Sequence, residues 1–301
     1  MRKFIINIIS FIIITTICFF ILWIILCYNR NEVLTLPEDV NIVFLGNSHI
    51  ECDINDTIIS NSYNFARSND YPEQVYCKVK LLKLSNPHLD TIVVGYDNVI
   101  MEQDLSNEIL GTYSPYYYDQ YSFEDITNII AHSSFKYCVS HFYTPFKFSQ
   151  IEHILPSSAN KSINITNLKN LGGYEYLVRD KLQQHITLQK DKKAHKSSFD
   201  FLSIYFLNKT IDFCKANNMT IILLATPQHH MSKIDTLTYK QYHQQNYKDL
   251  KFYDFKSLQL PDSCFGDLNH LNHKGAKIFS NFLEKEVIHK NKYKNNHNSL
   301  K

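Results

Sequence analysis

A serine that directly follows a short apolar run is the first residue in this chain whose type and position suggest chemistry. The run at residues 41–45, NIVFL, leads into Gly46, Asn47 and Ser48. If the run is a strand and a helix follows it, Ser48 lies at the sheet edge where open α/β folds bind ligands, beside helix N–H groups that favour negative charge. Serine is also a preferred N-cap of helices. The stretch alone therefore leaves Ser48 either as a nucleophile or as a helix cap.

A second stretch with chemical potential lies near the other end of the chain. Residues 267–276 read DLNHLNHKGA, with Asp267 three residues before His270 and just ahead of a predicted helix. Because the serine hydroxyl is a weak nucleophile, it needs a base to remove its proton. His270 can serve Ser48 as that base, while Asp267 orients the imidazole and stabilises its charged form. The alternative for this stretch is an ordinary polar surface loop.

Together the two stretches resemble the SGNH (GDSL-like) hydrolase family, in which Gly-x-Ser follows the first strand and Asp-x-x-His precedes the last helix. Residues 267–276 match the family form Asp-x-x-His-Leu-Asn-x-x-Gly-Ala. The resemblance covers residues 41–289, apart from the middle of the chain. It implies a catalytic triad of Ser48, His270 and Asp267 that works through an acyl-enzyme, and it implies no cofactor.

The resemblance also implies an oxyanion hole that starts with the backbone N–H of Ser48. Asn69 falls where the family usually has a Gly whose N–H donates, and Asn tolerates left-handed backbone angles better than most residues. The family's third donor is an Asn in Gly-x-Asn-Asp, but the simplest register here puts Asp97 at that position. Since an ionised Asp97 would repel an oxyanion, Asn98 is the expected substitute. This departure favours the membrane-associated glycan acyltransferase-like branches of the family.

Further histidines are expected near the site. His49 adjoins Ser48, so its side chain should point away from the serine and toward the rim, where it would contact substrate. His229 follows an apolar run in another loop at the same sheet edge and is a second predicted substrate contact. A zinc site made of His229, His230, His270 and His273 would lack carboxylate support and a fixed spacing. We therefore predict no metal.

The elements that must position these residues alternate between strand and helix. The expected strands are residues 41–45, 63–66, 91–95, 219–225 and 250–253, and the expected helices follow Ser48 and Pro72 and cover 199–217, 239–249 and 274–288. In the last helix, Ile278, Phe282 and Val287 are expected to face inward. This order predicts an α/β fold of three layers, α/β/α, around a mostly parallel central sheet of the SGNH or flavodoxin-like kind.

The N-terminus indicates a membrane anchor. Arg2 and Lys3 precede an uncharged run over residues 4–28, which is long enough to span a bilayer as a helix. A cleaved signal peptide would have a shorter apolar region and a small-residue cleavage site, and the bulky Leu26 before Cys27 argues against a lipoprotein site. The positive-inside rule places the N-terminus in the cytoplasm and the rest of the chain on the extracytoplasmic side.

The predicted organisation follows from these patterns. Residues 1–3 are cytoplasmic, 4–28 are a transmembrane signal anchor, 29–40 a linker, 41–289 an SGNH hydrolase-like domain with an insertion at about 100–195, and 290–301 a disordered basic tail. The composition is globular, with 44% hydrophobic residues, and the net charge of +2 offers no case for binding nucleic acid. The seven cysteines contain no CxxC pair, so neither a zinc ribbon nor a redox motif is predicted.

Three functions remain open at this level. The leading hypothesis is a membrane-anchored serine esterase or O-acyltransferase that acts on acyl esters, chiefly acetyl esters, of envelope or surface glycans. A transferase would also need a partner that supplies the acyl donor, such as a membrane transporter. The second hypothesis is a non-catalytic relative that binds or scaffolds in a polysaccharide-modification complex, as the altered third block suggests. The third is an unrelated anchored α/β protein in which Ser48 is structural.

Overall fold

The computed structural model describes residues 2–28, 34–97, 117, 120–133, 172–189, 199–232 and 237–288. Asn98, most of the predicted insertion and the predicted tail at 290–301 lie outside these residues. The chain divides into two compact units, Met1–Val33 with Leu105–Ser162, and Leu34–Asp104 with Ile163–Lys301. The candidate site lies in the second unit.

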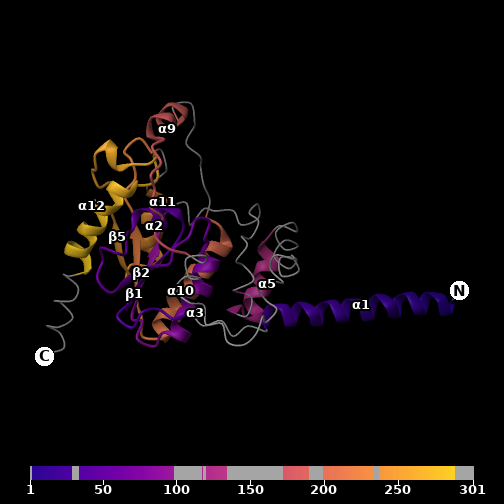
Figure 1. The fold of residues 1–301 in the computed structure, drawn as a ribbon. Helices are drawn as coiled ribbons and strands as arrows, with labels where there is room; N and C mark the ends of the chain where they lie inside the picture. The colour runs from indigo at the N-terminus through magenta and orange to yellow at the C-terminus, as the bar shows by residue number, and fades with distance from the viewer. Residues whose placement is uncertain are drawn as a thin grey trace. The chain divides into compact units, whose positions relative to one another are not determined.

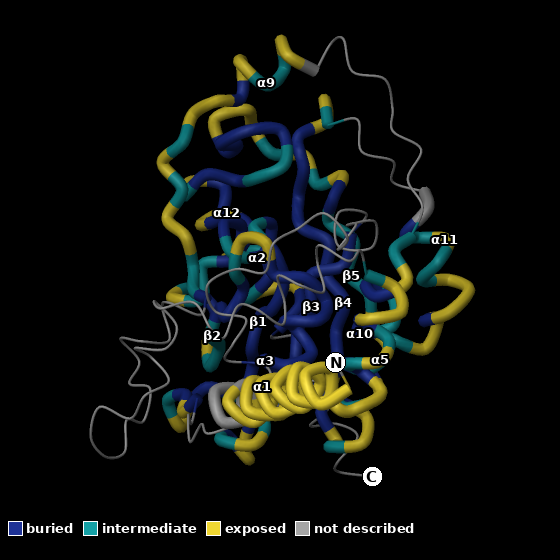
Figure 2. Tube along the Cα trace, turned by 90° about the vertical axis from the view of Figure 1, so that its right-hand side faces the viewer, coloured by how far each residue is buried: buried dark blue, intermediate teal, exposed yellow. Residues whose placement is uncertain are grey.

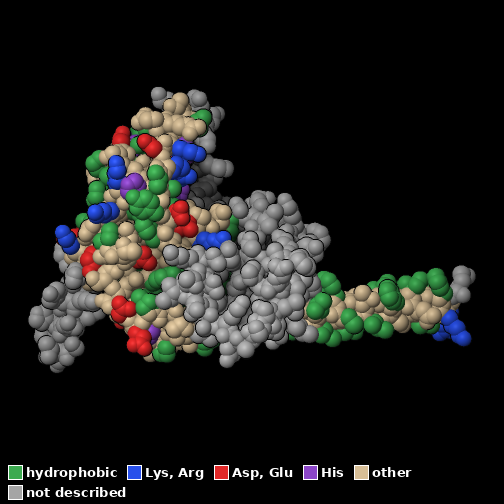
Figure 3. All heavy atoms as spheres, in the orientation of Figure 1, with side chains coloured by type: hydrophobic (Ala, Val, Ile, Leu, Met, Phe, Trp, Pro, Cys, Tyr) green, Lys and Arg blue, Asp and Glu red, His purple; other side chains and the backbone are tan. Residues whose placement is uncertain are grey.

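In the first unit, the helix α1 (Arg2–Tyr28) is almost wholly apolar, and hydrophobic side chains line its visible face while basic residues stand at its N-terminal end (Figure 3). The segment Arg2–Leu22 has a mean hydropathy of 2.8. At 1.5 Å per residue, 27 helical residues extend about 40 Å, more than the roughly 30 Å of a bilayer core. Among the described residues, this one helix is therefore long and apolar enough to cross a membrane. The same unit contains α5 (Phe123–His132), which Ser122 caps.

The second unit is built on a sheet of five parallel strands in the order β2-β1-β3-β4-β5. Figure 1 labels β1, β2 and β5 of this sheet, and Figure 2 labels all its strands. The strands are β1 (Ile42–Leu45), β2 (Ser62–Asn64), β3 (Thr91–Gly95), β4 (Thr220–Ala225) and β5 (Lys251–Asp254). The three central strands, β1, β3 and β4, are buried along nearly their whole length (Figure 2), which explains their continuous runs of Val, Ile and Leu. The predicted parallel α/β fold is confirmed.

Helices cover both faces of this sheet. On one face α2 (Ser48–Asp53) packs against α12 (His273–Leu283), and on the other α3 (Pro72–Ser85) packs against α10 (Phe201–Ala216). Alternate residues of β1 point to opposite faces, as the pleat requires. Phe44 joins a buried apolar cluster with Ile50 of α2 and Phe279 of α12, while Val43 is buried on the other side. The described residues of the unit also contain α9 (Leu182–Gln189) and α11 (Leu237–Asn246).

The inward face of the last helix differs from the expectation at Ile278, whose side chain is 49% exposed. The helix instead buries Ala276, Phe279 and Leu283, which recur at helical spacing. After Leu283 the backbone continues as a short π-helix, Glu284–Ile288, which brings Val287 into the core. Val287 lies four residues after Leu283 and extends the same buried face, whereas Ile278 lies about 100° around the helix from Phe279.

Two predicted boundaries are also wrong. In the expected linker at 29–40, Leu34 and Leu36 are buried, and the Leu36 N–H donates to Asn86 Oδ1 at 2.7 Å. The described part of that linker therefore belongs to the α/β unit. Similarly, residues 172–189 were expected in the insertion, but the Lys181 N–H donates to the carbonyl of Gly266 at 2.8 Å. This segment instead packs beside the loop that carries His270.

Candidate active site

The site lies where the order of the strands reverses. From β1 the chain first adds β2 on one side and later β3 on the other, and open α/β sheets bind ligands at the carboxyl ends of such strands. Ser48 follows β1, and Asp97 follows β3. The turn after β1 passes close to the end of β3, and Gly46 permits this. Its φ is +148°, and a Cβ there would lie 3.3 Å from the backbone nitrogen of Gly95.

Ser48 is the first residue of α2 and is not its N-cap. The cap is Asn47, whose Oδ1 accepts the backbone N–H of His49 at 3.0 Å. Asn47 thus satisfies one of the free N–H groups at the helix start and leaves the serine hydroxyl for other contacts. In the part of the chain that the structure describes, the backbone N–H of Ser48 has no hydrogen-bond acceptor. The proposed capping role therefore belongs to Asn47.

The structure brings Ser48, His270 and Asp267 together. His270 Nε2 lies 2.8 Å from Ser48 Oγ, and His270 Nδ1 lies 2.9 Å from Asp267 Oδ1. The Asp267 contact favours a proton on Nδ1, which leaves Nε2 to accept the Ser48 proton. Both Ser48 and His270 are only partly buried, so small molecules can reach them.

The loop that presents His270 is fixed at both ends. Asp267 Oδ1 accepts the backbone N–H groups of Asn269 and His270 at 2.8 and 2.9 Å. On the other side of His270, the Leu271 N–H donates to the buried Asp53 at 2.8 Å. Asn272 then caps α12 by accepting the N–H groups of residues 274 and 275. The motif DLNHLNHKGA is therefore a folded turn and helix start, in which Asp267 and Asn272 fix the backbone on either side of His270.

Burial and the charges around this loop favour the neutral form of His270. Burial lowers the pKa of His270 below its usual range, and the positive charges of His49 and Arg179 act in the same direction against the effect of Asp267. Burial alone would raise the pKa of Asp267, but its hydrogen bond with His270 and the nearby charges hold it well below its usual range. At neutral pH the pair is thus a neutral imidazole and a carboxylate, which is the state that a base needs.

Arg179 is a site residue that the sequence did not reveal. Its Nη2 donates to Asp267 Oδ2 and lies 3.3 Å from His270 Nδ1. Its guanidinium therefore helps keep Asp267 ionised and adds a second support to its side chain. No motif marks this residue, because it stands in an irregular segment that was assigned to the insertion.

Of the expected oxyanion donors, the structure describes Ser48 and Asn69. Asn69 has φ +64°, the left-handed conformation for which Asn is suited, and its loop is held near α2 because the Arg67 N–H donates to the Gly46 carbonyl at 3.1 Å. Ser68 adds two hydrogen bonds to the carboxylate of Glu51. Asn98 lies outside the described residues, and its role stays a prediction.

His49 is not at the rim, and that expectation is wrong. It is buried, and its Nδ1 lies 2.5 Å from Asp97 Oδ2, so the helix turns its side chain inward toward the end of β3. Its ring packs edge-on against the ring of His270, with centroids 5.1 Å apart. We expected Asp97 to face the oxyanion as an ionised carboxylate. In the structure its carboxylate contacts the His49 ring.

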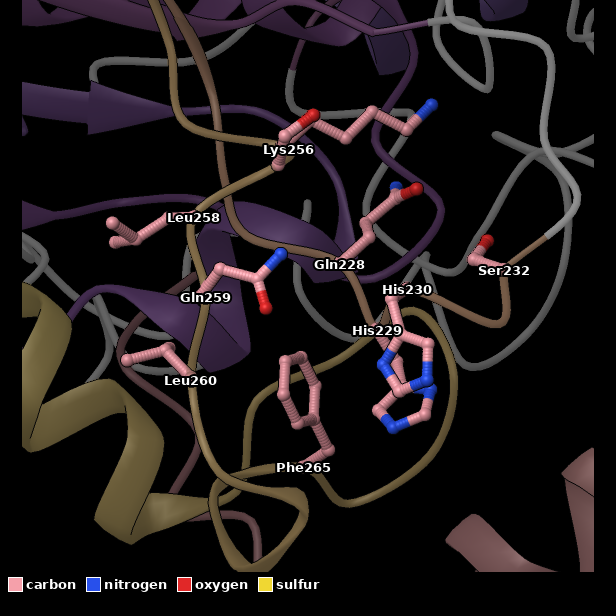
Figure 4. Close-up of a pocket in the computed structure, with 10 residues that line it drawn as sticks. Gln228, His229, His230, Ser232, Lys256, Leu258, Gln259, Leu260 and Phe265 are labelled. Carbon is pink, nitrogen blue, oxygen red and sulfur yellow. The ribbon is translucent and has the colours of Figure 1, made fainter.

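His229 lies in the loop after β4, beside the loop that carries His270. It is buried, donates its backbone N–H to Leu268, and contacts Asp262 Oδ1 through Nε2 at 3.1 Å. Figure 4 shows its ring beside that of His230, in a pocket of about 250 Å³ whose lining includes neither Ser48 nor His270. A contact between His229 and substrate stays a prediction.

The four histidines considered as zinc ligands do not gather. Among the described residues, the one three-ligand group of His, Cys or carboxylate side chains is His229, His230 and Asp262, whose ligand atoms lie within 4.8 Å of one another. His270 instead faces Ser48, and the ring of His273 stacks on Tyr176. The His229–Asp262 contact has the length of an ordinary hydrogen bond.

Comparisons with known proteins leave the activity to be inferred from this geometry. A family model without a descriptive name matches residues 174–292, less than half of the chain. No curated protein matches the sequence. Among solved structures, a crystal structure of a candidate acylhydrolase from Bacteroides fragilis is similar, at 12% identity over 83% of this chain and 86% of that chain, with a TM-score of 0.35. A likeness at this level establishes neither a shared fold nor a shared activity.

Proposed function

We propose that this protein is a membrane-anchored serine ester hydrolase or O-acyltransferase of the SGNH type. The observation that carries the proposal is the 2.8 Å contact between Ser48 Oγ and His270 Nε2, with Asp267 bound to the other ring nitrogen. A nucleophile, its base and the group that orients the base are the three parts of a serine triad. Their placement at the reversal of strand order supports a ligand site there.

The reaction would proceed in two steps. In the first, Ser48 Oγ bonds to the ester carbonyl carbon, its proton passes to His270, and the carbonyl oxygen becomes an anion that the Ser48 N–H stabilises. The anion collapses, the ester bond breaks, and the leaving alcohol takes the proton from His270. In the second step, water or a sugar hydroxyl gives its proton to His270 and attacks the acyl carbon; the bond to Ser48 Oγ then breaks, and His270 returns the proton to Ser48. Water yields hydrolysis, and a sugar hydroxyl yields transfer.

The test uses the full chain in detergent. We expect p-nitrophenyl acetate turnover to fall at least about 1,000-fold in Ser48→Ala and in His270→Ala, since both groups take part in bond making. Ser60→Ala and His88→Ala, which change exposed residues, are the matched controls. A fluorophosphonate probe should label Ser48 even in a transferase that hydrolyses poorly. Absence of both Ser48-dependent turnover and Ser48 labelling would exclude the proposal.

The proposed substrates are acyl esters of envelope or surface glycans. The SGNH resemblance and the apolar α1 support this choice. Release of acetate from acetylated envelope polysaccharide, and transfer of a labelled acyl group to deacylated polysaccharide, distinguish hydrolysis from transfer. A preference for small soluble esters over both polymers would argue against a glycan substrate.

The proposed topology places the N-terminus in the cytoplasm and the α/β unit outside the membrane. Protease added to intact cells should then remove the α/β unit, while a tag at the N-terminus should stay protected. The chain should remain with the membrane fraction after a carbonate wash. Release by the wash, or protection of the α/β unit, would contradict the anchor or its orientation.

A non-catalytic binding role is the second candidate, and Asp97 favours it, because the pattern of the SGNH family has an Asn that donates to the oxyanion at this position. The two candidates differ in the labelling experiment. A binding protein would retain polysaccharide affinity in Ser48→Ala and would show no probe adduct in the wild type.

A further inference from the structure

The pairing of His49 with Asp97 raises the question of what a second histidine and carboxylate do beside Ser48. Asp97 follows β3, the strand next to the one that leads to Ser48, so its carboxylate lies at the same sheet edge. An ester carbonyl attacked by Ser48 becomes negative in this region. A carboxylate in a site of low polarity would raise the energy of that anion unless its charge were cancelled.

The structure contains the group that cancels it. His49 Nδ1 and Asp97 Oδ2 are 2.5 Å apart, and the two side chains are only 6% and 7% exposed. A buried carboxylate at this distance favours a proton on both ring nitrogens of the histidine. Burial by itself lowers the pKa of His49, but the charge and hydrogen bond of Asp97, aided by the charge of Asp53, raise it above its usual value.

The position of the ring connects this pair with the reaction. The His49 ring packs edge-on against His270, which itself contacts Ser48. With Nδ1 used by Asp97, the group left on His49 is Nε2, which has no hydrogen-bond partner among the described residues. Lys256 also acts on His49, and its positive charge opposes protonation of the ring, whereas the charges of Asp97 and Asp53 favour it.

We propose that His49 and Asp97 work as one charge-neutral unit beside the nucleophile, in which the His49 imidazolium cancels the Asp97 carboxylate and offers positive charge to the tetrahedral anion formed on Ser48. This inference rests on the proposed serine mechanism. It gives Asp97 a function that does not require the carboxylate to donate a hydrogen bond.

The variants that test it are His49→Ala, Asp97→Asn and the double variant, assayed as the full chain in detergent. His49→Ala removes the positive charge beside the Asp97 carboxylate, so kcat should fall about 100-fold or more, the usual loss for one oxyanion-stabilising group, while KM changes little. In the double variant the carboxylate is replaced by a neutral amide, and kcat should recover at least about tenfold relative to His49→Ala. A double variant no better than His49→Ala would overturn the proposal, because the charge of Asp97 would then not be the cause of the loss.

A further variant and a second measurement guard against misfolding. His49→Gln keeps a polar contact with Asp97 but carries no charge, so its melting temperature should stay near that of the wild type while kcat falls. Wild-type kcat in His49→Gln would reject the proposal, and His88→Ala serves as the exposed-histidine control.

Thermal unfolding of the two single variants and the double variant measures the pairing without any activity. We expect the fall in melting temperature of the double variant to be smaller than the sum of the falls in the two single variants. If the wild type shows no Ser48-dependent turnover, the proposed function fails and the catalytic role of His49 fails with it, while the unfolding result still reports the pair. If turnover depends on Ser48 but not on His49, this inference alone fails.

Discussion

Asp267 holds both the ring and the backbone of His270 with the same oxygen. Its Oδ1 lies 2.9 Å from His270 Nδ1 and 2.9 Å from the His270 backbone nitrogen. The spacing Asp-x-x-His allows this double contact, because the intervening residues form a tight turn around the carboxylate. The position and tautomer of the base are therefore set by one local turn together with Arg179, which supports the second oxygen of Asp267.

Asp267→Asn should lower kcat about 10³- to 10⁴-fold, since an amide can present a donor to Nδ1 and then favours the wrong tautomer of His270. KM should change much less, because Asp267 does not face the acyl group in the proposed mechanism. Steady-state kinetics on p-nitrophenyl acetate measure both constants. Asp180→Asn is the matched control, as this carboxylate is exposed. Equal effects of the two substitutions would show that Asp267 does not orient the base.

The pH dependence should show an acid limb centred below pH 6.5, the ordinary pKa of histidine, because His270 must be neutral to act as base and its pKa is lowered. Activity is then fully present above that pKa and falls tenfold for each pH unit below it. His49→Gln removes a positive charge that lowers the pKa of His270, so the limb should move to higher pH. Profiles of kcat/KM for both proteins measure the shift. A limb that stays in place would mean that the two rings do not interact electrostatically.

Much of the site could be predicted from sequence because its central residues stand at the ends of regular elements. The apolar runs at β1, β3 and β4 mark buried parallel strands, and parallel strands bring their carboxyl ends to one edge. Ser48 follows the first of these strands directly, and His270 stands just before the last helix. Local pattern and strand order therefore suffice to expect that the two meet.

The parts that could not be predicted depend on contacts between irregular segments. Arg179 reaches Asp267 from a stretch with no periodic pattern, and the pairing of His49 with Asp97 requires the exact rotation of a short helix. The misplaced face at Ile278 has a different cause. The inward face follows Ala276, Phe279 and Leu283, and Ile278 lies about 100° around the helix from Phe279, so this apolar residue was assigned to the wrong face.

The buried pair of Lys78 and Asp70 offers a stability test for the loop that carries Asn69. Lys78 Nζ lies 2.5 Å from Asp70 Oδ2 and donates to the carbonyl of Phe65 at 2.8 Å, with both side chains buried. Lys78→Met should lower the free energy of unfolding by about 3–5 kcal/mol, because it leaves an uncompensated buried carboxylate. Denaturant unfolding measures the loss.

The control for this test is Lys215→Met, an exposed lysine at the end of α10, which should change stability by less than about 0.5 kcal/mol. Adding Asp70→Asn to Lys78→Met should restore part of the lost stability, since the buried charge is then removed. If the double variant were less stable than Lys78→Met, the loss would have to come from packing of the lysine stem and not from the carboxylate.

Gly275, in the first turn of α12, lets the last helix approach the loop before it. A Cβ at this position would lie 2.2 Å from the Cys264 carbonyl oxygen, a rigid backbone atom, so Gly275→Ala must push the start of α12 away. Such overpacking typically costs about 1–3 kcal/mol, and here it also displaces the turn that holds His270. We expect a lower melting temperature and a fall in kcat together. Gly173→Ala is the matched control, because a Cβ there meets no atom within 4 Å. A Gly275→Ala protein with wild-type stability and turnover would show that the contact between α12 and the Cys264 carbonyl does not determine the position of the base.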